Sequence, residues 1–288
     1  MSKPKIGVQA MMLKDKFEEL GAYETLKKMS ELGYKAVEIS QIPMTPENVD
    51  EIKRAKDELS LDIASLSCVV EDEGAGGNDA LESQFDKIVQ DCKTLDVDIL
   101  RIGMLPFANM KSLDLVLEFT RKANEYAVKL KEHGIRLFYH NHHVEFMRFD
   151  GKFMLDIIAE ECPDLGFELD LHWVQRGGAD PIQVLRKYAD RAEIVHIKDY
   201  RIGQIPDEAF EALANQDVPT FYNYFVNIIE FAEIGEGSMD YKRIIDECID
   251  LDIRYLLVEQ DMLYGRDPFD CLITSRDNLY AMGHKDLF

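Results

Sequence analysis

The chain has 288 residues, of which 46% are hydrophobic and 31% charged, and its formal net charge is −22. This size and composition exclude a disordered segment, a collagen-like fibre and a disulfide-rich mini-protein, and they leave one large domain or two ordinary ones. The 55 acidic residues outnumber 33 Lys and Arg without any local basic stripe. Such a charge balance argues against nucleic acid and anionic membranes as partners.

The sequence lacks the features of a membrane protein or a secreted protein. It has no run of 18 apolar residues, and Lys3-Pro4 lead directly into the first apolar stretch without the hydrophobic segment of a secretion signal. We therefore predict a cytoplasmic protein. The five cysteines are odd in number and widely spaced, which predicts reduced thiols, mostly buried, rather than a disulfide framework or a zinc ribbon.

Eight short apolar runs, each followed by a segment with helical spacing, indicate alternating strands and helices. The runs are Lys5 to Met11, Lys35 to Ser40, Asp62 to Val69, Asp98 to Met104, Ile135 to His140, Gly166 to Asp170, Glu193 to Lys198, and Arg254 to Glu259. Eight such units predict a closed (β/α)₈ TIM barrel that forms a single domain over residues 1–288. A doubly wound open sheet is the rival fold. It is weakened because no GxGxxG or GxxxxGK[ST] loop follows a predicted strand.

The interval between the seventh and eighth runs is about twice as long as the others, and it indicates an insertion at about 201–234. The insertion carries an aromatic cluster of Phe221, Tyr222, Tyr224 and Phe225. Such a cluster suits a lid, a subunit contact in a homo-oligomer, or a surface excursion without a function. The sequence leaves these three interpretations open.

Ionisable residues gather at the carboxyl ends of the last four predicted strands, where TIM barrels carry their chemistry. The segments are 139–146, 168–173, 195–199 and 258–261. Taken singly, His140 or His196 could be an ordinary hydrogen-bonded histidine, Asp170 a helix cap, and Glu259 the partner of an arginine. Several carboxylates buried together are costly unless a cation or proton compensates them. Carboxylates with imidazoles and no thiolates therefore predict a site for Mn²⁺, Mg²⁺, Co²⁺ or Zn²⁺.

These motifs, in this order and spacing, resemble the sugar phosphate isomerase/epimerase superfamily, the xylose isomerase-like TIM barrels. The matching segments are 33–38, 139–146, 168–173, 178–181, 196–199, 235–241 and 258–261, which together span nearly the whole chain. The stretch His140-Asn141-His142-His143-Val144-Glu145-Phe146 has the HNHxxEF pattern of one branch, related to tagatose 3-epimerase and inosose dehydratase.

The resemblance implies one divalent cation, commonly manganese, held by Glu, Asp, His and Glu from strands five to eight. Asp170, His196 and Glu259 fall on three of these positions. The fourth departs from the pattern, because strand five ends in His140 and the nearest carboxylate is Glu145. We predict Glu145 as the fourth ligand, since a third carboxylate balances a dication better. His140 and His142 are the alternatives.

The resemblance also implies a reaction on a carbohydrate, in which two acid–base residues move a proton on a carbon beside a ketone. The cation would stabilise the enediolate. Glu259 fits one acid–base position, and Glu145, His140 or His142 would take the opposite face. The identity of this second acid–base residue decides the reaction. One outcome is isomerisation or epimerisation of a ketose, keto-sugar or cyclitol. The other is loss of a hydroxyl, as in a lyase or dehydratase.

Two further residues are expected near the substrate. His172 and Lys198 follow Asp170 and His196 by two residues, and on an alternating strand they would point the same way and could stabilise negative oxygens. Of the other classes of function, DNA hydrolysis is disfavoured by the acidity of the chain. A non-catalytic metal- or carbohydrate-binding protein remains the alternative to an enzyme.

Overall fold

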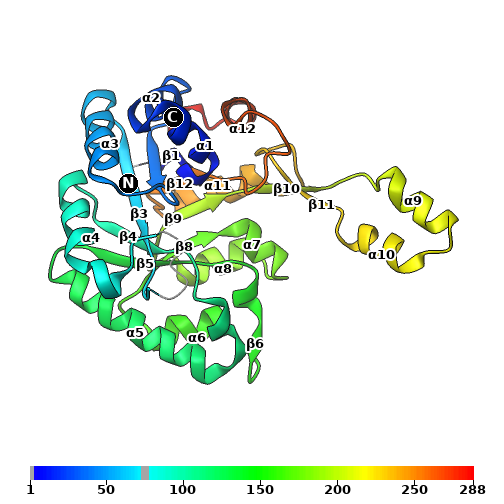
Figure 1. The fold of residues 1–288 in the computed structure, drawn as a ribbon, viewed down its shortest axis with the longest axis horizontal. Helices are drawn as coiled ribbons and strands as arrows, with labels where there is room; N and C mark the ends of the chain where they lie inside the picture. Colours follow the sequence, from blue (N-terminus) through cyan, green and yellow to red (C-terminus); the bar gives the residue numbers. More distant parts are fainter. Residues whose placement is uncertain (1–2, 73–77) are drawn as a thin grey trace.

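Eight parallel strands close into a barrel in the computed structural model of the chain, which describes residues 3–72 and 78–288 (Figure 1). Around the barrel the strands run in the order β1 (Lys5–Gln9), β12 (Tyr255–Val258), β9 (Ala192–Ile197), β8 (Gly166–Asp170), β5 (Arg136–His140), β4 (Ile99–Ile102), β3 (Asp62–Cys68) and β2 (Ala36–Ile39). Each overlaps one predicted run. The prediction of a (β/α)₈ TIM barrel is confirmed.

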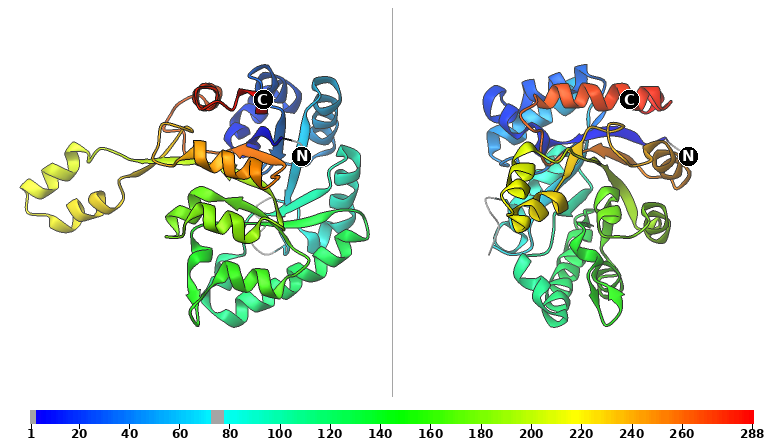
Figure 2. Two further views of the ribbon diagram at one scale, coloured as in Figure 1. Left: turned by 180° about the vertical axis from the view of Figure 1, so that it is seen from behind. Right: turned by 90° about the vertical axis from the view of Figure 1, so that its right-hand side faces the viewer.

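Helices follow the barrel strands and cover the outside of the barrel (Figures 1 and 2). They are α1 (Lys14–Leu20), α2 (Ala22–Glu31), α3 (Pro46–Leu59), α4 (Leu81–Leu95), α5 (Leu113–Lys131), α6 (Met154–Glu161), α7 (Leu171–Arg176), α8 (Pro181–Tyr188), α11 (Tyr241–Asp250) and α12 (Pro268–Ala281). Short 3₁₀ turns occupy Ala10–Leu13, Phe107–Lys111, Val144–Phe146 and Lys285–Leu287, and β6 (Arg148–Phe149) pairs with β7 (Lys152–Phe153). None of the helices that the structure describes is long and apolar enough to cross a membrane.

Local sequence explains where several of these helices begin. The side chain of Thr45 accepts a hydrogen bond from the Asn48 N–H, and Pro46 fills the first helical position of α3, where its missing N–H is not needed. Asp180 and Pro181 start α8 in the same way. All five cysteines lie buried as free thiols.

Two layers of apolar side chains stabilise the barrel. The larger layer lies between strands and helices. The smaller fills the barrel interior with Ala36, Ala64, Ile99, Phe138, Ile194, Tyr255 and Leu257. Gly166 is required by this interior packing, because a Cβ there would lie 2.4 Å from the ring of Phe138.

Residues 199–232, which we call the arm, leave the barrel between β9 and β12. An antiparallel pair, β10 (Asp199–Ile202) and β11 (Ile229–Ala232), carries the helices α9 (Asp207–Ala214) and α10 (Val218–Val226). Figures 1 and 2 show both helices projecting away from the body of the molecule. The arm corresponds to the insertion expected at about 201–234.

Candidate active site

The charged residues of the site share the inward face of the barrel with the apolar interior. Successive side chains of a strand alternate between faces, so a residue two places after an inward apolar residue also points inward. Ile99, Phe138, Ile194 and Leu257 are thus followed two residues later, on the same face and near the carboxyl ends of their strands, by Arg101, His140, His196 and Glu259. The barrel interior is therefore apolar towards the amino end and charged at the carboxyl end.

Four of these buried side chains come together as a candidate metal group. His140, Asp170, His196 and Glu259 each offer one ligand atom, and the four atoms lie within 4.8 Å of one another. They come from β5, β8, β9 and the residue after β12, and all four are buried. The structure thus brings together three of the expected ligands, with His140 in the fourth place.

Asp170 serves two purposes at the junction of β8 and α7. Its Oδ1 accepts a hydrogen bond from the Trp173 N–H at 2.9 Å and caps α7. Its Oδ2 lies 3.1 Å from Lys198 Nζ and 3.9 Å from His140 Nε2. The capping bond fixes the carboxylate, so that the second oxygen is held facing the candidate metal group.

Glu168 lies behind the two imidazoles. Its Oε1 is 3.1 Å from His140 Nδ1 and 3.0 Å from His196 Nε2. The opposite nitrogen of each ring faces the group, as shown by the 2.8 Å distance between His196 Nδ1 and Glu259 Oε2. A carboxylate behind a ligating histidine orients the ring and raises its basicity, and this is the usual arrangement in metal sites.

Glu38 and Arg101 complete the charged layer. Arg101 Nε lies 2.9 Å from an oxygen of Glu38 and 2.9 Å from an oxygen of Glu168, and Ser65 donates a hydrogen bond of 2.8 Å to Glu38. Reasoning from strand ends missed both residues. The signal that could have found them is a single charged residue inside each of two apolar strands, Ala-Val-Glu-Ile and Ile-Leu-Arg-Ile.

Lys198 places an ammonium against the same group. Its Nζ lies 2.8 Å from Glu259, 3.1 Å from Asp170 and 2.9 Å from Asp261. Asp261 lines the neighbouring cavity. Lys198 therefore has one anionic partner outside the candidate ligands.

Glu145 lies elsewhere. Its Oε1 accepts a hydrogen bond of 2.6 Å from the Tyr139 hydroxyl, and its Oε2 accepts one of 2.7 Å from the His142 N–H. Both oxygens thus accept hydrogen bonds from β5 and from the segment that follows it, and Glu145 is not among the four clustered side chains. The structure instead gives Glu145 the task of holding the backbone of His142.

His142 and His172 occupy different surroundings. His142 lines the cavity together with His140 and Glu259. His172 is buried, stacks on Phe231 at 5.3 Å and meets Trp173 edge-on. The alternation that predicts His172 beside Asp170 fails, because β8 ends at Asp170 and α7 begins at Leu171.

The electrostatics of the site follow from burial and crowding. Burial alone would lower the pKa of His196, but the charges of Glu168, Glu259 and Glu38 raise it well above its usual value. Burial would raise the pKa of Glu259, but Lys198 and His196 lower it. Burial together with the charge of Glu38 raises the pKa of Glu168 to about 8, and burial raises that of Asp170 to about 6.

The donor set fits a divalent cation. The ligand atoms that face one another are one nitrogen of each imidazole and one oxygen each of Asp170 and Glu259. Glu168 contacts the other nitrogen of each ring and so orients both imidazoles toward the group. Two imidazoles and two carboxylates without thiolates suit Mn²⁺, Co²⁺ or Zn²⁺ better than Mg²⁺, which prefers oxygen ligands.

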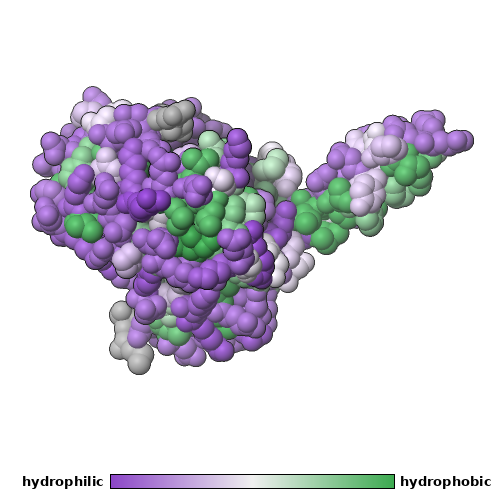
Figure 3. All heavy atoms as spheres, turned by 90° about the horizontal axis from the view of Figure 1, so that it is seen from below, coloured by the Kyte–Doolittle hydropathy of each residue, from purple (hydrophilic) through white to green (hydrophobic). Residues whose placement is uncertain are grey.

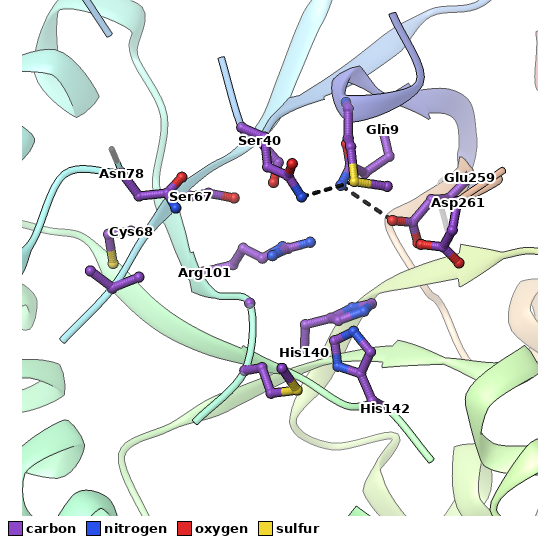
Figure 4. Close-up of a pocket in the computed structure, with 15 residues that line it drawn as sticks. Gln9, Ser40, Ser67, Cys68, Asn78, Arg101, His140, His142, Glu259 and Asp261 are labelled. Atoms are coloured by element: carbon purple, nitrogen blue, oxygen red, sulfur yellow. Dashed lines mark hydrogen bonds between the residues drawn. The ribbon is translucent and has the colours of Figure 1, made fainter. Parts of the chain in front are cut away.

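A cavity of about 290 Å³ opens beside this group at the carboxyl end of the barrel. Figure 4 shows Glu259 and Asp261 on one side of it, His140 and His142 on another, and Arg101 reaching between them. Gln9 donates a hydrogen bond of 3.3 Å to Glu259. The cavity is thus lined by polar and charged groups that could orient a hydroxylated molecule.

Residues 26–261 match the family described as xylose isomerase-like TIM barrel, so the chain belongs to that family. Inosose dehydratases from two strains of Clostridium perfringens are 28% identical over 141 residues, a region that spans 48% of this chain and 44% of theirs. The match therefore covers less than half the length of these relatives.

Solved structures of similar shape carry related names. A sugar phosphate isomerase/epimerase from Parabacteroides distasonis superposes with a TM-score of 0.71 at 18% identity, covering 100% of this chain and 96% of that one. A 3-keto-D-glucoside 4-epimerase from E. coli gives 0.66 at 14% identity, covering 98% and 99%. At these identities the likeness shows a shared fold.

Proposed function

We propose that the chain is a divalent-metal-dependent isomerase or epimerase of a ketose, keto-sugar or cyclitol. The observation that carries this proposal is the buried group of His140, Asp170, His196 and Glu259 beside the polar cavity. These four residues would hold the cation. When bound, the cation would polarise a substrate carbonyl and so make the neighbouring C–H bond more acidic.

The acid–base work falls to residues that line the cavity. Glu259 has a lowered pKa, so it is a carboxylate near neutral pH and can accept a proton. Burial lowers the pKa of His142 to about 3, so its imidazole is neutral near neutral pH. His142 and Glu259 both line the cavity, so we assign them the two acid–base positions. Lys198 would stabilise a negative oxygen of the substrate.

Dehydration is the second candidate reaction. It is favoured by the partial match to inosose dehydratases, and it uses the same first step. Removal of a proton beside a carbonyl leads to isomerisation if a proton returns. It leads to dehydration if a hydroxyl on the next carbon leaves with a proton as water.

The test measures solvent deuterium incorporation by mass spectrometry. The protein, reconstituted with Mn²⁺, Co²⁺ or Zn²⁺, is incubated in deuterated water with a panel of ketoses, 3-keto-glycosides and keto-cyclitols. We expect a metal-dependent gain of deuterium in at least one class, and an isomeric product. A product lighter by one water supports dehydration instead.

The matched control is Asp170→Asn. Asparagine caps a helix as well as aspartate does, so this variant keeps the start of α7 while removing one anionic ligand. We expect it to fold and to lose deuterium exchange. A wild-type protein that binds metal and substrate but exchanges nothing would show that the chain is a binding protein rather than an enzyme.

A further inference from the structure

The arm presents an apolar face that the chain itself leaves uncovered. Seven of the twelve large hydrophobic side chains that are exposed in the described residues lie on it, namely Ile202, Phe210, Leu213, Val218, Tyr222, Phe225 and Val226. Figure 3 shows hydrophobic residues gathered along the arm. Exposed apolar surface of this extent commonly marks an interaction site.

The helices of the arm are short and bury little apolar surface of their own. α9 has 8 residues and α10 has 9, whereas isolated helices are marginal below about 12 to 15 residues. The two helices pack against each other, with the rings of Phe210 and Phe221 6.2 Å apart, and Ala209 is their one fully buried residue. A partner that is always available, such as a second copy of the chain, would stabilise them.

The barrel offers a matching acceptor. A groove of about 200 Å³ beside the active-site cavity is lined by Val69, Val70, Glu71, Met104, Leu105, Pro106, Phe107 and Phe119. Phe107 on its edge is 78% exposed, the most exposed large hydrophobic side chain of the described residues. Val69 and Met104 also line the active-site cavity, so whatever fills the groove would close one wall of the active site.

Topology separates the arm from the groove within one chain. The groove residues follow β3 and β4, and the arm follows β9. In the closed barrel β3 lies four places from β9 in either direction, which is directly across the ring. Both features therefore stand at the carboxyl rim on opposite sides, and the arm projects outwards rather than across its own rim (Figure 2).

The part of the arm beyond the β10–β11 pair is acidic. These residues, 203–228, contain four acidic side chains, Asp207, Glu208, Glu211 and Asp217, and no Lys or Arg. This composition disfavours nucleic acid and anionic lipid. We propose that the arm docks in the groove beside the active site of a second copy of the chain, so that two copies exchange arms about a twofold axis.

The test compares three variants by sedimentation and light scattering at the highest soluble concentration. Wild type should have the mass of a dimer. Phe225→Asp on the arm and Phe107→Asp at the groove should each raise the dimer dissociation constant at least about tenfold, because each variant breaks both symmetric contacts. The matched control is Val128→Asp on α5, where the side chain is 45% exposed, and this variant should remain a dimer.

Mixing the two interface variants gives the decisive result. A heterodimer of Phe225→Asp and Phe107→Asp retains one unaltered arm and one unaltered groove that face each other, so mixing should restore dimers. A monomeric wild type would overturn the proposal. Phe107→Asp that remains fully dimeric would also overturn it, because the arms would then pair with something other than the groove. Neither outcome depends on catalytic activity.

Discussion

At the amino end of the barrel, Asp98, Arg136, Glu193 and Arg254 form ion pairs with side chains that are 33% to 46% exposed. At the carboxyl end, Glu38, Arg101, His140, Glu168 and His196 are buried, and several of their polar atoms lack a hydrogen bond. Exposed pairs contribute little stability and need no ligand, whereas charges that are buried together are costly to desolvate even when they pair with one another. The contrast supports our proposal of a binding site at the carboxyl end.

The largest effect is expected from Asp170→Asn. Removing one anionic ligand should lower kcat/KM about 10³-fold, since a metal ion contributes several kcal/mol to stabilising the transition state. Kinetics on the substrate class found by deuterium exchange measure the loss. Thermal unfolding of the metal-free proteins serves as the control, and it should change little because the α7 cap is retained.

Replacing one arginine at the amino end and one at the carboxyl end of the barrel compares how much buried and exposed ion pairs contribute to the free energy of unfolding. Arg101→Leu removes the buried guanidinium that pairs with both Glu38 and Glu168, so the free energy of unfolding should fall by about 3 to 5 kcal/mol. Arg136→Leu at the amino end should lower it by about 1 kcal/mol or less. Urea denaturation of both variants provides the values. Equal losses would remove the distinction between the two ends.

The identity of the strand-five ligand gives an intermediate effect. His140→Ala should weaken metal binding at least about tenfold, a change of about 1.4 kcal/mol or more. Glu145→Gln should leave the metal affinity unchanged, because both Glu145 oxygens accept hydrogen bonds from Tyr139 and the His142 N–H. Calorimetric titration with Mn²⁺ and Zn²⁺ measures both. A larger loss of metal affinity in Glu145→Gln than in His140→Ala would make Glu145 the ligand.

The smallest effect concerns the pH dependence of the amino-end pairs. Burial alone would raise the pKa of Asp98, but hydrogen bonds from Arg136 and Arg254 outweigh it and lower the pKa. A lowered pKa adds stability above the unfolded value of about 3.9, and this stability disappears as the pH falls through the folded value. Asp98→Asn should therefore be less stable than wild type by about 1 kcal/mol or less at pH 7, and the gap should close in acid. A gap that widens in acid would contradict this.

The barrel could be predicted from the sequence because its strands are continuous apolar runs that recur at a regular interval. The same register brings Asp170, His196 and Glu259 to one rim. The position of Glu145 depends on a short turn, Val144–Phe146, which no periodicity indicates. Arg101 and Glu38 were missed because they lie inside strands. The long interval before β12 indicated the insertion, but its direction depends on the β10–β11 pair and the packing at its base.

A divalent cation held by β5, β8, β9 and the end of β12 would remain with the protein during purification. The metal content of the purified protein is measured by inductively coupled plasma mass spectrometry after loading and gel filtration. We expect about one Mn²⁺, Co²⁺ or Zn²⁺ per wild-type chain and much less in Asp170→Asn. A wild-type protein that retains no cation under any loading condition would contradict the account.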